Sequence, residues 1–383
     1  MDQPQGFVAP DKPMHVCKLR KALYGLKQAP RNWFQKLTGS LILHGFKASV
    51  SDPSLFVKTN GSHVVYVLIY VDDLIITGSH ATFIDDFVRL LNRDFSLKDL
   101  GNLHYFLGIE IHRSKSSIHL SQQKYICDIL ERSHMSGAKP ISSPAEPGSR
   151  LTTSGDPLFD PALYRRIVGA LQYVTITRPE ISYAVNRVCQ FMHNPTESHW
   201  CAVKRILRYL KGTSSSGLVL HKARDSRLIA FSDAGWASDP DDCRSQHGFA
   251  IYFGGNLVSW SSCKQKVVSR SSTEAEYRAI AFTAAELIWI QQLLQEMAIT
   301  IQKPPILLCD SLSATFLSAN PVLHQWSKHI KIDYHFVREQ VASKDLIVRH
   351  VRSLDQIADI FTKAVGNHHF RTLRDKLHVR SRS

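Results

Sequence analysis

The feature that most constrains this chain is an apolar segment interrupted by two adjacent acids. Residues 64–70 are rich in β-branched and aromatic side chains, which is typical of a buried strand. Residues 74–77 have the same character and indicate a return strand. Because only Asp72 and Asp73 break this pattern, we expect a hairpin with both acids at its tip.

An acid pair at such a tip indicates metal binding. Adjacent carboxylates repel each other and lose hydration in a rigid turn, so the pair is costly without a counter-ion. Mg²⁺ removes that cost because it takes oxygen ligands and leaves coordination positions for substrate phosphates. Two such ions can align a 3′-hydroxyl with an incoming nucleotide. The alternative is an ordinary solvated turn.

Helix and strand patterns divide the rest of the chain. Pro30 precedes apolar residues spaced on one helical face, and Gly45 ends that run. Residues 142–157 are dense in Ser, Pro, Gly and Thr, which indicates a linker or an extended crossover. Residues 161 to 217 have a helical pattern. From residue 223 onward, strands followed by helices predict a mixed α/β domain, and we expect the basic end of the chain to fray.

The charge of the chain indicates a polyanionic partner. The formal net charge is +14 and the pI is near 9.5, which favours nucleic acid. A membrane surface is the rival partner, but no basic amphipathic helix with a broad apolar face supports it. The apolar run before Asp72 is too short to cross a bilayer. The seven cysteines form no CxxC pair, so we expect free thiols in an intracellular protein.

A second set of acids lies in the C-terminal part, each at the edge of an apolar element. One follows the strand 228–231, one lies on a long helix beside two alanines, one ends the run 306–309 and one lies near a helix start. Each alone could be a cap or a surface acid. Together they can converge on two Mg²⁺ ions, which activate water and stabilise the leaving oxygen. These residues are Asp233, Glu276, Asp310 and Asp359.

Several strings resemble one known family. Residues 70–73, YVDD, resemble the YVDD box of reverse transcriptases. The strings at 18–34, 104–111 and 120–132 resemble the copia-type segment under the incoming nucleotide, the primer-gripping hairpin and the start of the thumb. Five later blocks resemble ribonuclease H of the copia type, among them FSDAGWASDPDDCRS, LLCDSLSAT and QIADIFTK. The chain thus resembles copia-type LTR retrotransposon Pol from residue 1 to about 365.

This resemblance implies an α+β and α/β multidomain fold. It comprises a truncated reverse-transcriptase palm, a helical thumb and connection, and a ribonuclease H-like domain with a mixed sheet. The expected boundaries are a truncated palm with the start of the thumb at 1–141, a linker at 142–160, the helical thumb and connection at 161–222, the ribonuclease H domain at 223–365 and a basic tail at 366–383.

For the polymerase, the resemblance makes Asp72 and Asp73 metal ligands, and it places Gln28 and Arg31 where the nucleotide and template are positioned. A polymerase of this kind also needs an aspartate on the first palm strand. In the family that residue lies upstream of the string that resembles residues 1–7. We therefore expect polymerase activity of this chain alone to be absent or very weak.

For the ribonuclease, the resemblance makes the later acids catalytic metal ligands for Mg²⁺, with Mn²⁺ as a substitute. Glu276 fits the family's helix better than its neighbour Glu274. His350, on the strand before the last acid, would assist product release; the alternative is a solvated loop histidine. The departures are Ser311 in place of Asn, Cys243 in place of a basic residue, and Gln325-Trp326-Ser327 in place of a more basic stretch before Lys328-His329.

A different metal site could be drawn from His329, Asp333 and His335, but KHIKIDYHF is better explained as a helix that packs and contacts the nucleic-acid backbone. No zinc knuckle can be built from the cysteines.

The basic helices between the two acid sites are expected to contact phosphates without reading bases. The residues chosen are Lys204, Arg205, Arg208 and Lys211, and Arg178 and Arg187 belong to the same basic stretch. The implied partners are an RNA–DNA hybrid and a primer-template, in the cytoplasm, a virus-like particle or the nucleus. Two alternatives stay open: a non-catalytic nucleic-acid-binding remnant, and a degenerate fragment that does not fold stably because half a palm exposes a sheet edge.

Overall fold

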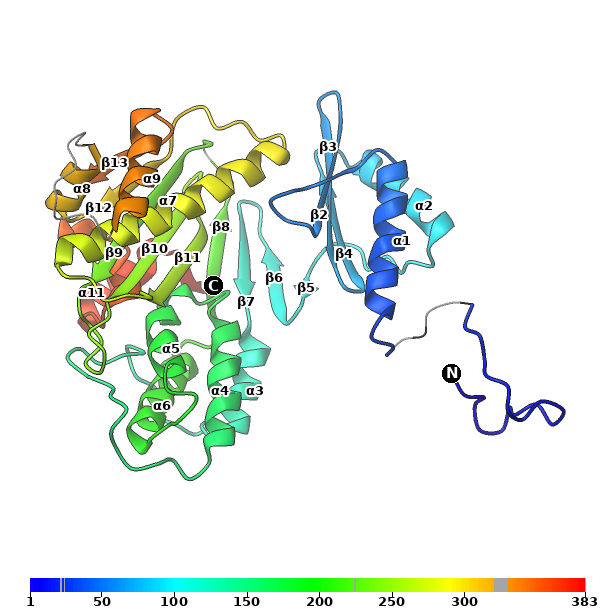
Figure 1. Cartoon of the computed structure of the whole chain (residues 1–383), viewed down its shortest axis with the longest axis horizontal. Helices are drawn as coiled ribbons and strands as arrows, with labels where there is room; N and C mark the ends of the chain where they lie inside the picture. The colour runs from blue at the N-terminus through cyan, green and yellow to red at the C-terminus, as the bar shows by residue number, and fades with distance from the viewer. Residues whose placement is uncertain (21–22, 24, 224, 320–329, 383) are drawn as a thin grey trace. The chain divides into compact units, whose positions relative to one another are not determined.

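The computed structural model describes residues 1–382 apart from 21–22, 24, 224 and 320–329. The chain divides into two compact units, which are described separately (Figure 1). The first unit comprises residues 1–99 and 292–299, and the second comprises residues 100–291 and 300–383.

The first unit is a four-stranded antiparallel sheet with two helices. The strands follow the order β1-β2-β3-β4. Leu37 and Leu41 of the first helix are fully buried and pack with Phe56 and Val67 of the sheet. The helix predicted after Pro30 is confirmed, and Gly45 beyond its end has a φ of 83°. The elements are α1 Ala29–Leu43, β1 Lys47–Ala48, β2 Leu55–Asn60, β3 His63–Tyr70, β4 Asp73–Gly78 and α2 Ala81–Asp94.

The predicted hairpin is present in this unit as strands β3 and β4. Tyr70 pairs with Asp73, so the two-residue turn consists of Val71 and Asp72. Val71 has a φ of 52°, which a tight two-residue turn requires. The turn therefore lies one residue earlier than the break expected from sequence, and Asp73 is the first residue of β4.

The second unit contains an antiparallel sheet built from distant parts of the chain. Its order is β14-β8-β7-β6-β5, so the C-terminal strand pairs with β8. Residues 366–383 were expected to fray, and this is wrong. Phe370, Leu373 and Val379 are buried, because the basic tail also carries apolar residues at helical spacing. The elements are β5 Tyr105–Phe106, β6 Ile109–Arg113, β7 Ser117–Ser121, β8 Ser216–His221, α11 Asn367–Lys376 and β14 Val379–Ser381.

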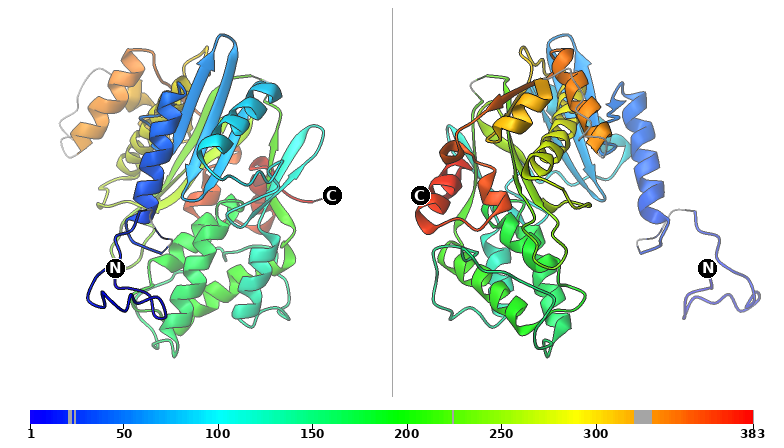
Figure 2. Two further views of the ribbon diagram at one scale, coloured as in Figure 1. Left: turned by 90° about the vertical axis from the view of Figure 1, so that its right-hand side faces the viewer. Right: turned by 60° about the vertical axis from the view of Figure 1, so that its left-hand side comes forward.

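Helices occupy the middle part of the sequence of the second unit, as the pattern from residue 161 predicted. Figure 2 shows α4, α5 and α6 grouped at one end of the second sheet of this unit, which is the mixed sheet described below. Residues 142–160 form neither helix nor strand, yet they are tied down: Nε2 of His199 lies 2.9 Å from the carbonyl oxygen of Thr152, and the Thr153 amide donates to Asp241. The elements are α3 Gln123–Arg132, α4 Pro161–Val174, η1 Pro179–Ile181, α5 Ser182–Cys189 and α6 Glu197–Gly212.

The second sheet of this unit is mixed, with the order β11-β10-β9-β12-β13. Strand β10 is antiparallel to β9 and β11, whereas β12 is parallel to β9 and β13. The long helix α7 crosses its strands in Figure 1. The predicted multidomain α+β and α/β fold class, with this mixed sheet in its C-terminal part, is confirmed. The elements are β9 Leu228–Gly235, β10 Gln246–Phe253, β11 Asn256–Lys264, α7 Ser272–Glu296, β12 Ile306–Cys309, α8 Leu312–Ala319, α9 Lys331–Ala342, β13 Ile347–His350, η3 Ser353–Asp355 and α10 Asp359–Thr362.

One core is shared by the helices and the mixed sheet of the second unit. Tyr164 of α4 and Leu207 of α6 belong to the same buried cluster as Ala250 of β10 and Phe361 of α10. This continuity fixes the position of α10, which is short and carries Asp359. Among the described residues, no helix is long and apolar enough to span a membrane.

Candidate active site

The mixed sheet brings acids from four elements of the second unit to one place. Leu308 of β12 pairs in parallel with Phe231 of β9, so Asp310 and Asp233 lie at matching positions two residues further along. Glu276 extends from α7, and Asp359 begins α10. We call these residues the acid cluster: Asp233, Glu276, Asp310 and Asp359.

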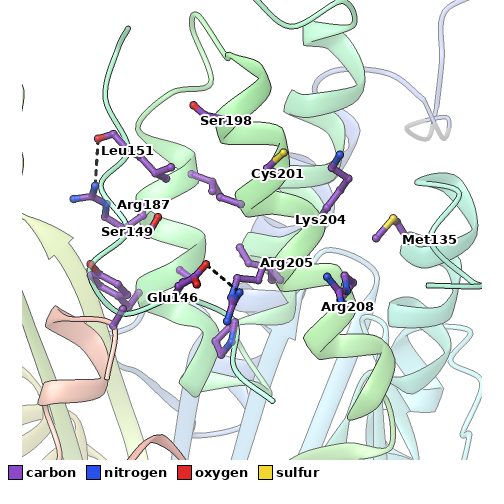
Figure 3. A pocket seen from close by; sticks show the side chains of 18 residues that line it. Met135, Glu146, Ser149, Leu151, Arg187, Ser198, Cys201, Lys204, Arg205 and Arg208 are labelled. Atoms are coloured by element: carbon purple, nitrogen blue, oxygen red, sulfur yellow. Dashed lines mark hydrogen bonds and ion pairs between the residues drawn. The ribbon is translucent and has the colours of Figure 1, made fainter. Parts of the chain in front are cut away.

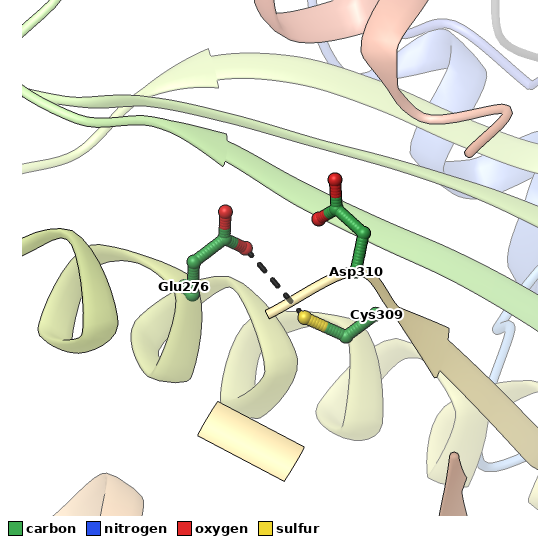
Figure 4. Close-up of side chains that lie close together, drawn as sticks. All are labelled: Glu276, Cys309 and Asp310. Atoms are coloured by element: carbon green, nitrogen blue, oxygen red, sulfur yellow. Dashed lines mark hydrogen bonds between the residues drawn. The ribbon is translucent and has the colours of Figure 1, made fainter. Parts of the chain in front are cut away.

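The carboxylate oxygens of the acid cluster are close enough to share metal ions. Oxygens of Asp233, Asp310 and Asp359 lie within 4.8 Å of one another. Asp310 also lies within 4.8 Å of Glu276 and of the Cys309 sulfur. Figure 4 shows the carboxylates of Glu276 and Asp310 beside that thiol. Asp310 therefore belongs to both groups, as expected of a ligand between two metal positions.

Burial disfavours the charged form of these acids. Asp233 is 3% exposed and Glu276 is 9% exposed. Burial, followed by the charges of Asp233 and Asp310, raises the pKa of Glu276 to about 9. Burial and the charge of Asp233 raise the pKa of Asp359 to about 7, and burial also raises the pKa of Asp233. A divalent cation would restore the ionised forms, so the donor set fits one.

Residues that sequence reasoning did not select hold the acids in place. The Thr362 hydroxyl donates to Oδ2 of Asp233, and the Lys363 ammonium lies 2.8 Å from Oδ1 of Asp359. The Gln356 amide donates to the backbone carbonyl of Ser232, which ties the segment before α10 to β9. Lys363 follows Asp359 by four residues, so helical spacing could have identified it, whereas Thr362 contacts an acid on a distant strand.

The two glutamates at the start of α7 have different surroundings. Glu276 accepts a hydrogen bond from the Cys309 thiol at 3.7 Å. Glu274 instead pairs with Arg278 at 3.0 Å and accepts the Arg270 amide. The structure therefore brings Glu276 into the acid cluster and uses Glu274 as an ion-pair partner on the same helix.

The remaining residues selected in the ribonuclease part lie on or near the mixed sheet. His350 ends β13, pairs with Cys309 of β12 and is exposed. Ser311 lies at the start of α8, where its hydroxyl accepts the Ala314 amide. Cys243 is exposed in the loop before β10 and has a φ of 55°.

The alternative metal site has no support in the described part of the chain. Asp333 pairs with Arg278, and no group of ligand atoms there includes Asp333 or His335. His329 lies outside the described residues, as do Lys328 and the replaced stretch Gln325-Trp326-Ser327. The helix expected for this string is present as α9, from Lys331 to Ala342.

The other acid pair lies at the hairpin of the first unit and is exposed. Neither Asp72 nor Asp73 belongs to a three-ligand group among the described residues. The Trp33 indole nitrogen donates to the Val71 carbonyl oxygen at 2.9 Å, which ties the start of α1 to the turn. Gln28 occupies the N-cap position of that helix without a side-chain capping bond, and Arg31 lies on its first turn; both are exposed.

The basic residues of α6 differ in their availability. Arg208 donates to the Lys139 carbonyl oxygen at 2.8 Å, and Arg205 lies 3.3 Å from Glu146. Lys204 and Lys211 have no partner among the described residues, and Lys211 is exposed. Two other arginines of the basic stretch are not available for the expected phosphate contacts.

Those arginines are Arg178 and Arg187, which are buried. Arg178 is fully buried, lies 2.7 Å from Glu180 and also donates to Thr213. Arg187 is 7% exposed and donates to the Leu151 carbonyl oxygen. Counting charges along a helix overstated its basic surface, because the count cannot tell a paired interior arginine from an exposed one.

Comparison with known proteins places these features in one family. Residues 1–147 match the family described as reverse transcriptase (RNA-dependent DNA polymerase). The chain is 52% identical over 380 residues to the retrovirus-related Pol polyprotein from transposon RE1 of Arabidopsis thaliana, covering 99% of the chain and 26% of the relative. It is 38% identical to the Pol polyprotein from transposon TNT 1-94 of Nicotiana tabacum, covering 100% of the chain and 29% of that relative.

Solved structures with related folds are distant. The foamy viral protease-reverse transcriptase in complex with dsDNA is 11% identical, with a TM-score of 0.43, and the match covers 86% of this chain and 60% of that chain. LC11-RNase H1 in complex with RNA/DNA hybrid is 15% identical, with a TM-score of 0.28, and the match covers 36% of this chain and 94% of that chain.

The sequence matches therefore define the class of this protein, which is the reverse-transcriptase family of retroelement Pol polyproteins. The chain belongs to the copia-type LTR retrotransposon Pol family. It spans about a quarter of the length of its relative from transposon RE1.

Proposed function

We propose that this chain cleaves the RNA strand of an RNA–DNA hybrid at the acid cluster. The convergence of its carboxylates from separate elements carries this proposal. Four buried or half-buried acids in two groups that share Asp310 are destabilising unless a cation is bound, and the family supplies the matching chemistry. The acid cluster would hold Mg²⁺, or Mn²⁺ in its place.

The bound metal would activate a water molecule and stabilise the leaving oxygen. The protein positions the ligands for that step: Thr362 orients Asp233, and Gln356 fixes β9 beside the start of α10. Lys363 neutralises part of the charge of Asp359. We assign product release to His350, because its exposed imidazole ends the strand next to β12.

The proposed substrate follows from charge and family. A net charge of +14 favours a polyanion, and Lys204 and Lys211 are available to contact phosphates. Arg205 and Arg208 can add contacts through guanidinium groups that already bind the protein. Selection of the RNA strand requires contact with its 2′-hydroxyls. The proposed location is intracellular, in the cytoplasm, a virus-like particle or the nucleus.

For polymerisation we propose absent or very weak activity when this chain is assayed alone. The described residues contribute no third ligand beside Asp72 and Asp73, although a two-metal site needs one. Primer extension with Mg²⁺ is the test. Extension that Asp73→Asn abolishes would overturn the proposal.

The test of the ribonuclease is cleavage of a labelled hybrid by the whole chain with Mg²⁺. Asp233→Asn and Glu276→Gln should each lower the rate by about 100-fold or more, since each removes a ligand. Glu286→Gln is the matched control, because Glu286 lies on the same helix and bonds Ser259 outside the acid cluster. Its rate should stay within about twofold.

The second candidate is a nucleic-acid-binding remnant without turnover, favoured only by the basic charge. Hybrid binding by a folded wild-type chain that shows no cleavage in Mg²⁺ or Mn²⁺ would favour it. A chain that does not unfold cooperatively would instead indicate a degenerate fragment.

A further inference from the structure

A cavity of about 450 Å³ lies in the second unit, outside the acid cluster. Its lining residues come from α5, α6 and the segment 144–151, together with Met135 and Ala364. None of the acid-cluster residues lines it. Figure 3 shows Lys204, Arg205 and Arg208 along α6, facing this space from one wall.

The lining of this cavity is strongly cationic. Arg187, Lys204, Arg205 and Arg208 contribute positive charge, and Glu146 is the one acid among the described lining residues, so their net charge is +3. Hydroxyl groups of serines on α6 and on the facing segment add neutral hydrogen-bonding groups. This combination favours an anionic ligand that carries acceptor oxygens.

The cationic side chains of this cavity differ in how many hydrogen bonds and ion pairs they already form within the protein. Lys204 has no partner among the described residues. Arg208 uses its Nε on the Lys139 carbonyl, and Arg205 makes only long contacts of 3.3 Å to Glu146 and Ser143. Since a guanidinium has five N–H donors, both arginines retain donors for a ligand.

The rest of the wall is apolar. Small and aliphatic side chains one turn apart on α5 and α6 face each other, and the half-buried ring of Tyr183 stands beside them. A cavity of this size lies within the range of about 300 to 1,000 Å³ that holds small organic ligands. A bare phosphate would leave most of it empty, so the ligand needs an apolar or aromatic body as well as its anion.

Such chemistry is that of one nucleotide, and the cavity adjoins the element that carries one acid of the cluster. Ala364 lines it two residues after Thr362, which ends α10, the helix that carries Asp359. A base inside a duplex stays paired and stacked, whereas an unpaired base can enter a pocket and stack there.

We propose that this cavity binds one unpaired nucleotide at a single-stranded end of the hybrid. The phosphate lies against Lys204 and Arg208, and the base lies against the apolar wall. This inference rests on the proposed function, because its ligand is part of the same substrate, but it predicts binding rather than cleavage.

The test compares two probes in EDTA, where metal-dependent cleavage is blocked: a blunt RNA–DNA hybrid, and the same hybrid with a short single-stranded DNA overhang. By fluorescence anisotropy, the wild-type chain should bind the overhang probe about tenfold more tightly, an effect typical of one stacked base. Lys204→Gln should abolish this ratio. Lys211→Gln removes the same charge from the same helix outside the cavity, so it should weaken binding of both probes equally and preserve the ratio.

Cys201→Trp supplies a second variant, because Cys201 is exposed at the cavity and a large ring there would fill its space. It should also abolish the overhang preference, with thermal melting confirming that the variant is folded. Adenosine 5′-monophosphate should compete weakly, since the rest of the strand contributes to binding.

An equal loss of preference in the Lys204 and Lys211 variants would overturn the proposal, as would the absence of any preference in the wild type. Full competition by the mononucleotide would also overturn it, in favour of a free-nucleotide site. Hybrid cleavage is measured separately, so an overhang preference without cleavage would contradict only the proposed function.

Discussion

At the scale of single residues, Lys363 links the charge of the acid cluster to metal binding. Its ammonium lies 2.8 Å from Asp359 and is 49% exposed, so the pair is worth about 1 kcal/mol or less. A metal ion must compete with this ammonium for the same carboxylate. The residue therefore weakens metal binding while it limits repulsion among the acids.

Lys363→Met should tighten binding of Mn²⁺ to the substrate-free protein by about fivefold, which corresponds to about 1 kcal/mol. Titration followed by electron paramagnetic resonance of free Mn²⁺ measures the change. Lys376→Met is the control, because Lys376 pairs with Asp355 at 3.6 Å outside the acid cluster. Weaker Mn²⁺ binding in Lys363→Met would show that the ammonium helps to organise the site.

The raised pKa values of the acids predict a pH-dependent stability. In the metal-free folded protein, Glu276 and Asp359 release their protons near pH 9 and 7, whereas their ordinary values are 4.5 and 3.8. Protonation thus favours the folded state. This contribution is fully present below the ordinary values and is lost as the pH rises through the folded ones.

In EDTA, the Tm should therefore fall as the pH rises from about 6 to about 9. Glu276→Gln should flatten this slope, because its neutral amide does not titrate. Saturating Mg²⁺ should raise the Tm most at the alkaline end, where the ligands are ionised. A Glu276→Gln variant with the wild-type slope would refute the assignment.

At the scale of elements, sequence predicted the local patterns well. The helix after Pro30 and the hairpin around Asp72 follow from apolar spacing within a few residues. The acids could be selected because each ends or interrupts an apolar run. Thr362 was not selected, because its contact with Asp233 depends on the distance between α10 and β9, which no local pattern encodes. Lys363 was not selected either, although it lies four residues after Asp359.

The C-terminal helix α11 contradicts the prediction made from local charge. Charge suggested a frayed tail, yet α11 buries Phe370 and Leu373, and Leu377 is buried just beyond its end.

Leu373→Ala should lower the free energy of unfolding by about 2 to 5 kcal/mol, since Leu373 is fully buried. Urea denaturation measures the loss. Arg371→Ala, exposed on the same helix, should change it by less than about 0.5 kcal/mol; equal effects would mean that the helix does not pack.

At the scale of the whole molecule, the acid cluster and the basic cavity belong to one unit and share its core. Tyr164, Leu207 and Phe361 lie in that single cluster. The helices that the sequence indicated as a separate region therefore pack against the sheet that carries the acids. Composition could predict a polyanionic partner from the charge of +14. It could not show that Arg178 and Arg187 are buried, because pairing is a property of the packed core.

The antiparallel sheet of the second unit also governs when this unit can finish folding. Strand β8 pairs with β14, and their partners Leu218 and Val379 are 161 residues apart in the chain. A ribosome adds about 5 to 20 residues per second, so roughly 10 to 30 seconds separate the synthesis of the two strands. During that interval the edge of β8 is open to pairing with other chains. Strand β14 thus completes the sheet and ends a period of exposure to aggregation.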